Sequence, residues 1–453
     1  MSGSVIYMEN KTNLKLFDID DSLVSYHFID LKDDHYHIYM DFISNAHCCP
    51  FCGSIKLISK GYYKKNLVSV PINDRHVTIH ARFKRIICND CNVSFSDHHS
   101  IYYVNTKFTR TAIVSILKRL KPYNVTYSQV ARDFGVSTQK IVDIFDMFVR
   151  VKRKHLPRIL LIDEFHFSRH SKYKYPVLLM NFENKVIIDV VESRRHEIFS
   201  TYLYSINKKE REEVEYICTD MSSTFRTLIH TYFPNSSHIV DHFHVTRLVN
   251  DQLNNTRKRI MRKYSKNKNS NEYKILKNKY RLLLKCQDDI DNETYKYDHT
   301  LEYHCTENTV LQAVLNIDED IRKAYQAKEE YLAFDQCTKA EIADCNKRQE
   351  FDSLIKKFKH INVEEFCELA DSLSNWKEEI LRSFIWIDDR RISNGPIEGK
   401  NNYIKKIISN ANGMANFKRA RNRIIYSQNK YETFSLLEHR DSIKTLKKEK
   451  DQK

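Results

Sequence analysis

The sequence contains little glycine and proline, and it has no long apolar run. Glycine and proline number 7 each among 453 residues, which excludes collagen-like and low-complexity proteins. No apolar stretch reaches the length of about 18 residues that a membrane-spanning helix needs, so we expect no such helix. The first residues also lack an apolar segment behind a basic start. We therefore expect no secretory signal and an intracellular protein.

Charge and apolar content favour a folded protein with a nucleic-acid partner. Hydrophobic residues make up 41% and aromatic residues 12%, which is enough for packed cores, and the length suits about two to four domains. Lys and Arg number 74 against 59 Asp and Glu, which gives a net charge of +15. Nucleic acid is the usual partner of such an excess. The alternative is a basic surface that serves solubility alone.

The 11 cysteines are more consistent with reduced thiols than with a secreted disulfide framework. Four of them form two CxxC motifs, in which each tight turn presents two sulfurs, so the pair of turns can surround one structural zinc ion. The predicted zinc ligands are Cys49, Cys52, Cys88 and Cys91. His47 and Cys48 are alternative ligands, although Gly53 favours a turn at the first motif. Alternating apolar residues between the motifs predict a hairpin, so we expect a zinc-ribbon-like module over residues 47–104.

Residues 105–152 follow the pattern of a helix-turn-helix domain. A short helical run precedes Gly135, which permits a tight turn, and Ser137 stands where it can cap the next helix. The exposed start of that helix would present the residues predicted to bind DNA, which are Thr138, Gln139 and Lys140. A plain helical hairpin without a DNA role is the alternative. Residues 49–153 carry 18 Lys and Arg against 6 Asp and Glu, which favours duplex DNA.

Five apolar runs in residues 153–250 predict buried strands, with helices before the fourth and the fifth. The runs are residues 158–164, 177–182, 185–191, 215–220 and 237–241. Three strands paired as a meander, followed by two that are reached through helices, form the arrangement of a ribonuclease-H-like core. In that sheet the first and fourth strands are neighbours. Each of these two strands ends in an aspartate, Asp163 and Asp220.

Aspartates at neighbouring strand ends predict a magnesium (or manganese) site. Hard oxygen ligands bind such ions, and two ions about 3.5–4 Å apart can clamp the attacking and leaving oxygens of a phosphodiester. The third carboxylate would be Glu398, in the first turn of a helix begun by Gly395 and Pro396. Glu164, beside Asp163, should point to the opposite face and suits the site less. The alternative for each single carboxylate is solvation at the end of a strand.

The other segments complete a multidomain α+β chain. Residues 251–380 show helical patterns and would form an insertion that splits the core. The second part of the core would span residues 381–430 and contain Glu398. Residues 1–46 would form an N-terminal segment, and residues 431–453 a charged C-terminal tail.

The predicted insertion is polarised in charge. Residues 251–285 hold 12 Lys and Arg against 2 Asp and Glu, whereas residues 286–370 hold 10 against 20. The basic half suits a DNA backbone, and the alternative is that it pairs with the acidic half. Residues 400–426 carry seven basic side chains and no acidic one. Those on the helix after Glu398 would track phosphates beside the metals, namely Lys400, Lys405 and Lys406.

Several motifs together resemble a known family. After the CxxC pair and the helix-turn-helix pattern come IDE at 162–164, TDM at 219–221, DHFH at 241–244 and SNGPIEG at 393–399. This ordered set spans about residues 47–430 and resembles the ISL-three family of bacterial insertion-sequence transposases. The last two motifs are the most specific ones.

The resemblance implies a DDE transposase in which Asp163, Asp220 and Glu398 form the catalytic triad. Asp241 also ends a strand, but Asp220 suits the triad better because its strand adjoins the first. Asp241 and His244 resemble an accessory Asp-x-x-His pair of related transposases. The alternative for this pair is the capped start of a helix.

The resemblance also implies partners and a location. Double-stranded DNA would bind both as the terminal repeats of the element and as the target. A homodimer or a larger assembly would form on DNA, in the bacterial cytoplasm and associated with the nucleoid. A DNA-binding regulator and a ribonuclease-H-like nuclease without transposition are the alternatives on the same scaffold. A tyrosine or serine recombinase is disfavoured because no nucleophile with a surrounding arginine set stands out.

Overall fold

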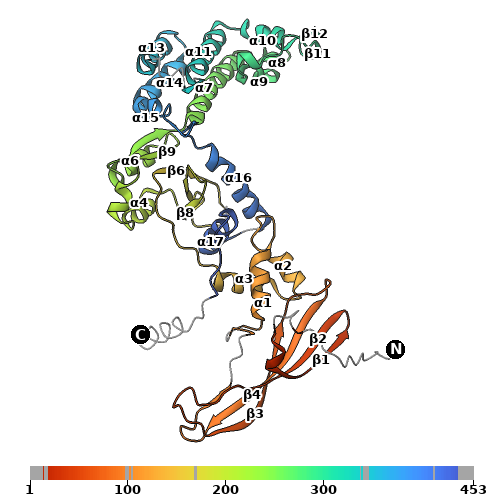
Figure 1. Cartoon of the computed structure of the whole chain (residues 1–453). Coiled ribbons are helices and arrows are strands. Elements are labelled where there is room, and N and C mark those ends of the chain that lie inside the picture. Colours follow the sequence, from red (N-terminus) through yellow and green to blue (C-terminus); the bar gives the residue numbers. More distant parts are fainter. Residues whose placement is uncertain are drawn as a thin grey trace. The chain divides into compact units, whose positions relative to one another are not determined.

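The structure is a computed structural model that divides into two compact units. One unit comprises residues 1–152 and 403–453, and the other comprises residues 153–402 (Figure 1). The described residues are 14, 19–96, 101–103, 106–167, 171–336, 338–339, 346–411 and 414–436. The predicted C-terminal tail beyond residue 436 lies outside them. No helix in the described part of the chain combines the length and apolarity needed to cross a membrane.

A twisted sheet dominates the first unit. Its strands are β1 (Val24–Lys32), β2 (His35–Phe42), β3 (Leu57–Val68), β4 (His76–Cys88) and β5 (Ser94–Ser96), after a short 3₁₀ turn η2 (Asp21–Leu23). The order is β1-β2-β4-β3 with β5 on β4, and only the β2–β4 pair is parallel. The β3–β4 hairpin is the one that the sequence predicts between the two CxxC motifs. Residues 1–46, for which no element was expected, contain β1 and β2.

Three helices follow this sheet and a fourth joins them from the end of the chain. They are α1 (Arg110–Arg119), α2 (Tyr127–Asp133), α3 (Thr138–Phe148) and α17 (Phe417–Gln428). Thr126 and Gln129 form a reciprocal capping box at the start of α2, and Gly135 turns the chain with φ of +62°. Ser137 occupies the N-cap of α3, but its side chain makes no capping hydrogen bond. The expectation of a Ser137 side-chain cap is therefore wrong.

Helix α17 packs on α1–α3 although about 300 residues separate them in sequence. Tyr426 Oη donates to the Leu117 carbonyl at 3.0 Å. Arg423 Nη2 donates to the carbonyls of Pro122 and Val125 at 2.9 and 2.8 Å. These contacts place residues 417–428 in the first unit, whereas the sequence pattern assigned them to the second part of the core.

The second unit contains a buried five-stranded sheet in the order β10-β9-β6-β7-β8. Its strands are β6 (Ile159–Glu164), β7 (Val177–Asn181), β8 (Ile187–Val191), β9 (Tyr216–Thr219) and β10 (Ser237–Val240). The first three pair antiparallel, while β9 runs parallel to β6 and β10 parallel to β9. The first and fourth strands are thus neighbours, as predicted. The helices beside this sheet are α4 (His196–Tyr204), α5 (Lys208–Glu212) and α6 (Ser223–Tyr232).

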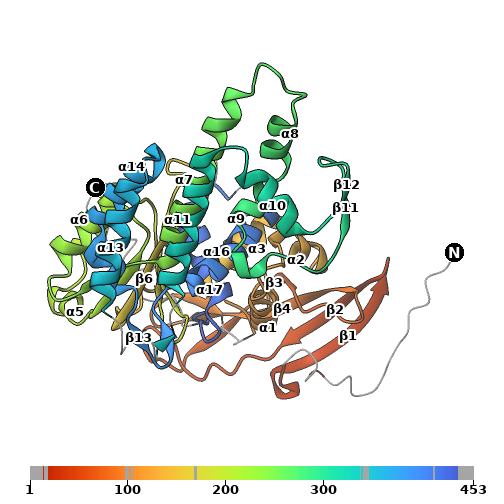
Figure 2. The ribbon, with the colours of Figure 1, turned by 90° about the horizontal axis from the view of Figure 1, so that it is seen from above.

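A mainly helical segment follows β10. Its elements are α7 (His242–Lys263), α8 (Asn271–Asn278), α9 (Tyr280–Leu284), the 3₁₀ turn η3 (Gln287–Asp289), β11 (Lys296–Asp298), β12 (Tyr303–Cys305), α10 (Glu307–Leu315), α11 (Glu319–Asp335), α13 (Lys347–His360), α14 (Glu364–Asn375) and α15 (Lys377–Arg382). Helices α7, α11, α13 and α14 form one layered bundle around a shared apolar cluster (Figures 1 and 2). The β11–β12 hairpin was not expected from the sequence. A second hairpin, β13 (Trp386–Ile387) with β14 (Arg390–Arg391), leads to α16 (Gly395–Asn410).

Ion pairs connect the basic and acidic halves of this segment. Arg259 pairs with Asp320 at 3.0 Å and with Glu365 at 2.8 Å, and Lys263 pairs with Asp318 at 3.0 Å. These contacts support the alternative in which the basic residues serve internal pairing. They leave less of the charge free for a DNA backbone than the composition suggests.

The packing of α3 generates a stability prediction. Phe145 is fully buried, and its ring lies 5.5 Å from Tyr127 and 6.0 Å from Tyr426 between centroids. Phe145→Ala should lower the free energy of unfolding by about 3–5 kcal/mol, because it removes apolar contacts and leaves a cavity. Urea unfolding followed by circular dichroism and amide hydrogen exchange in α3 measures the effect. Tyr431→Ala, at an 85% exposed site of the same unit, is the control. Equal stability of the two variants contradicts the prediction.

Candidate functional site

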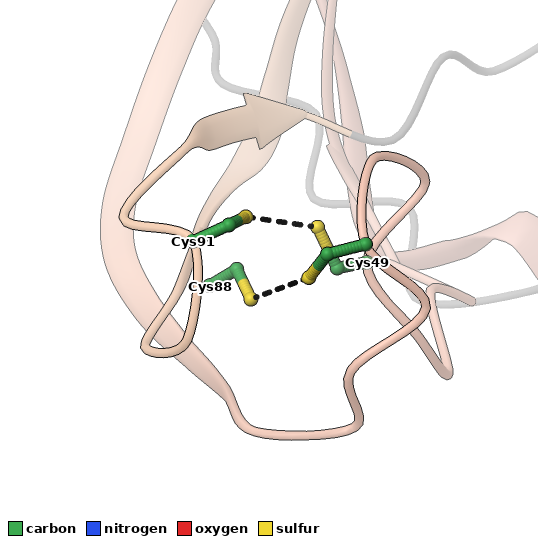
Figure 3. A group of neighbouring side chains, drawn as sticks. Cys49, Cys88 and Cys91 are labelled. Carbon is green, nitrogen blue, oxygen red and sulfur yellow. Dashed lines mark hydrogen bonds between the residues drawn. The ribbon is translucent and has the colours of Figure 1, made fainter.

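The four cysteines predicted as zinc ligands come together in the first unit. Cys49 and Cys52 lie in the loop before β3, Cys88 ends β4, and Cys91 follows in the next turn. The Sγ atoms of Cys49 and Cys91 are 3.6 Å apart, as are those of Cys52 and Cys88, and all four lie within 4.8 Å of one another (Figure 3). Sulfurs around a tetrahedral zinc ion with bonds of about 2.3 Å would be about 3.8 Å apart. The cluster therefore has the dimensions of a zinc site.

The same backbone turn presents the sulfurs of each motif. Gly53 N donates to the Cys49 carbonyl at 2.9 Å, and Asn92 N donates to the Cys88 carbonyl at 2.9 Å. Gly53 and Asn92 both have positive φ, which the tight turn requires. The Cys91 backbone N–H, which bonds the Cys88 sulfur, lowers the pKa of Cys88 to about 6. The two alternative ligands, His47 and Cys48, do not belong to the four-sulfur group.

Asp163, at the end of β6, is buried in the second unit. Its Oδ1 accepts from the backbone N of Glu164 at 2.8 Å, and its Oδ2 accepts from Asn401 Nδ2 at 2.7 Å. Burial raises the pKa of Asp163 to about 7, and the negative charges of Asp220 and Glu398 add to the effect. The carboxylates predicted as a triad thus interact electrostatically.

Asp220 follows β9, the neighbour of β6. Burial raises its pKa as well, while the positive charge of His244 counteracts this. Its Oδ1 is buried, and the described residues offer this oxygen no hydrogen-bond partner. A buried carboxylate oxygen with a vacant lone pair is costly unless a cation or another donor occupies it. The donor set at these strand ends therefore fits a hard divalent cation.

Asp241, at the end of β10, forms a third acidic position at the same sheet edge. It is fully buried, and its Oδ2 accepts from His244 Nδ1 at 3.0 Å. This hydrogen bond raises the pKa of His244. Asp241 is the N-cap residue of α7, but its side chain makes no capping hydrogen bond. The alternative for Asp241 and His244, a side chain that caps the start of a helix, therefore does not describe their contact.

Glu398 lies in the first turn of α16, where the sequence predicts it. Its carboxylate lies within 4.8 Å of the ligand atoms of Asp241 and His244. Among the described residues, Glu398 does not form an equally close group with Asp163 and Asp220. The imidazole of His244 is a favourable neighbour for the two carboxylates of this group. Glu164 pairs with Arg194, whose Nη1 donates to both of its oxygens at 2.6 and 2.7 Å, and its negative charge contributes to the raised pKa of Asp220.

Two asparagines complete the site, and the sequence analysis did not select them. The Asn394 backbone N donates to Asp241 Oδ1 at 3.1 Å, and its Nδ2 donates to the Ile162 carbonyl at 3.3 Å. Asn401 donates to Asp163, as described above, and is 6% exposed. The spacing in the sequence could have indicated Asn401, because it stands three residues after Glu398 and therefore about one helical turn along the same face.

The residues predicted to bind DNA are accessible to different extents. Thr138, Gln139 and Lys140 are exposed at the start of α3, and Gln139 Nε2 donates to Asp143 Oδ1 at 2.7 Å. Lys405 and Lys406 are exposed on α16. Lys400 is half-buried, and burial lowers the pKa of its ammonium group.

A comparison with protein families identifies the chain. The family model of ISL3-type DDE transposases, described as "Transposase", matches residues 160–424. The chain belongs to the ISL3 family of transposases. The match confirms the resemblance that the ordered motifs indicate, and it covers α16 and the sheet of the second unit except for Ile159 at the start of β6. No curated protein matches this transposase.

The four-sulfur cluster generates a prediction for this transposase. Cys88→Ser should lower the zinc content of the purified chain by one ion, because three thiolates and a hydroxyl hold zinc far more weakly than four thiolates. Elemental analysis measures the content. Cys48→Ser is the matched control, since it removes an exposed neighbouring thiol outside the cluster. Unchanged zinc in Cys88→Ser would refute the site.

Proposed function

We propose that this transposase is a DDE enzyme that binds the terminal repeats of an insertion sequence, cleaves the DNA ends and transfers them into target DNA. The observation that carries the proposal is the convergence at one sheet edge. Asp163 and Asp220 end adjacent parallel strands, and α16 brings Glu398 to the same edge from 178 residues beyond Asp220 in sequence.

The strand order supports a ribonuclease-H-like core. A three-stranded antiparallel meander, extended on the side of its first strand by two parallel strands, is the arrangement that this fold requires. The helical segment between β10 and α16 would then be an insertion into this core. Aspartates at the carboxyl ends of adjacent parallel strands face the same side, which suits a shared ligand.

Asp163, Asp220 and Glu398 would hold two magnesium (or manganese) ions. Such ions polarise the phosphodiester and stabilise the charge on the attacking and leaving oxygens. The protein's own residues position these ligands. Asn401 holds one oxygen of Asp163 and thereby fixes the plane of the carboxylate. Asp241 and Asn394 anchor the turn from which Glu398 projects.

His244 would have an accessory role. Its Nδ1–H donates to Asp241, which leaves Nε2 as the nitrogen that can hold or release a proton beside the reacting oxygens. The raised pKa keeps the imidazole protonated to higher pH than usual, so its positive charge can offset the neighbouring carboxylates. In the reaction, a 3′-hydroxyl released by hydrolysis would attack a phosphodiester of the target strand and displace a target 3′-hydroxyl, and no protein–DNA covalent bond would form.

The first unit would bind the element ends. We infer that α2, the Gly135 turn and α3 form a helix-turn-helix, because the first residues of α3 are exposed while its opposite face is buried. The four-sulfur cluster and the β3–β4 hairpin would form a zinc-ribbon-like module beside it. Two ends must be held together for transposition, so a dimer or a larger assembly would form on DNA.

Asp220→Ala tests the catalytic assignment. Strand cleavage and strand transfer with magnesium should fall to background, because the second strand-end ligand is lost, whereas binding of the terminal repeats should persist. Labelled DNA ends in cleavage, joining and gel-shift assays measure the three steps. Normal transfer by this variant would exclude the triad. Cleavage without joining in the wild type would favour a nuclease, and binding without either step would favour a regulator.

Asn401→Ala tests the positioning of Asp163. Loss of the amide that orients a metal ligand should reduce cleavage about 10–100-fold and raise the magnesium concentration needed for half-maximal rate. End binding should not change. Asn402→Ala is the matched control, because Asn402 is the exposed neighbour on the same helix. Equal magnesium dependence of the two variants would show that Asn401 does not position the ligand.

A further inference from the structure

A second group of metal-ligating side chains lies in the same unit as the catalytic carboxylates but does not include any of them. His230 extends from α6, His238 from β10, and Glu379 from α15. Their ligand atoms all lie within 4.8 Å of one another. The three residues come from both the sheet and the helical segment, so anything bound between them would join these two parts.

The hydrogen bonds of Thr219 determine which nitrogen of His238 is free. Thr219 Oγ1 donates its single proton to the Asp220 carbonyl at 2.8 Å. At its 2.8 Å contact with His238 Nε2 the same oxygen must therefore accept, so Nε2 carries the proton. In the neutral ring, Nδ1 is then a bare lone pair. His238 is only 1% exposed, and no described residue donates to its Nδ1.

The environment keeps this imidazole neutral. Burial lowers the pKa of His238 to about 4, while Glu379 acts in the opposite direction. A neutral imidazole with one nitrogen hydrogen-bonded and the other unoccupied is the form that ligates a metal. A buried acceptor without a donor is otherwise costly, so the site is built for an occupant.

Glu379 provides the oxygen ligand and is itself held in place. Arg226 donates to both of its oxygens at 2.7 Å, and the Arg226 guanidinium lies 4.1 Å from the Trp376 ring centroid. Each oxygen keeps a further lone pair, and a hydrogen-bonded carboxylate is typical of a metal ligand. Arg226 and Arg382 oppose an additional cation near His238. Their positive charges disfavour any added cation. Strong bonds to the histidine nitrogens can offset this penalty, which favours an ion that prefers nitrogen over a hard ion such as magnesium.

We propose that His230, His238 and Glu379 bind a zinc ion that joins the core sheet to the helical segment. Two imidazole nitrogens and one carboxylate oxygen suit zinc, with water as the fourth ligand on the exposed His230 side. The ion would also fix the end of β9, because His238 holds Thr219, the residue before Asp220. It would be distinct from the ion of the four-cysteine cluster and from the ions at the catalytic carboxylates.

Zinc stoichiometry of the full-length chain tests this proposal. After dialysis to equilibrium against buffered zinc, His230→Gln should hold one ion fewer than the wild type, and the loss should add to that of Cys88→Ser in the double variant. His230 is exposed, so its replacement should leave the fold intact, which circular dichroism checks. His360→Gln is the control, because it removes an exposed histidine outside any such group.

A second measurement separates ligation from a local packing effect. Zinc added to the metal-depleted Cys88→Ser chain should raise its Tm, and this increase should disappear when His230→Gln is also present. Cobalt in the same Cys88→Ser chain should show weak ligand-field bands that His230→Gln removes. Equal zinc content and equal Tm response with and without His230 would overturn the proposal. An equal loss of zinc in His360→Gln would also overturn it, because binding would then be non-specific.

Discussion

The hydrogen bond from the Asn394 backbone to Asp241 Oδ1 closes the core of the second unit. It joins residues 153 positions apart, and the Asn394 side chain adds a second link to the Ile162 carbonyl of β6. Both Asp241 and Asn394 are fully buried, so these bonds form in a region of low dielectric where losing a partner is expensive. Because Glu398 follows four residues later, this contact holds the start of its helix at the sheet edge.

The carboxylates at this edge of the sheet repel one another, and neighbouring groups must offset that repulsion. Asp163, Asp220 and Asp241 end three adjacent strands, and burial together with neighbouring negative charges raises the pKa of the first two. His244 supplies a compensating charge from within, and Asn401 supplies a neutral donor. The remaining negative charge makes this edge of the sheet favourable for a cation.

Local sequence patterns predicted those features that depend on residues close together in the sequence. The strands of the second sheet follow from continuous apolar runs, and the cluster of four cysteines follows from the CxxC spacing. Asp163 and Asp220 could be selected because a strand end and a strand order suffice to bring them together. Glu398 could be selected because glycine and proline mark the start of its helix.

The remaining features depend on tertiary contacts that no local pattern encodes. Asn394 and Asn401 are ordinary amides in sequence, and their contacts arise only because Asn394 and α16 come close to the ends of β6 and β10. The position of α17 depends on the carbonyl groups of Pro122 and Val125, which lie in the loop between α1 and α2. The pairing of basic with acidic residues in the helical segment likewise requires knowledge of which helices are neighbours.

The contact between Asp241 and Asn394 bears on how the length of the helical segment between them can vary. The chain leaves the sheet at Asp241 and returns at Asn394, and these two residues are in direct contact. The intervening 152 residues therefore form a loop whose ends already meet, and the entropic cost of closing such a loop grows only slowly with its length. A change in the length of this segment therefore need not move Asp163, Asp220 or Asn394. The contact of the two ends places few demands on the size of the helical segment between them.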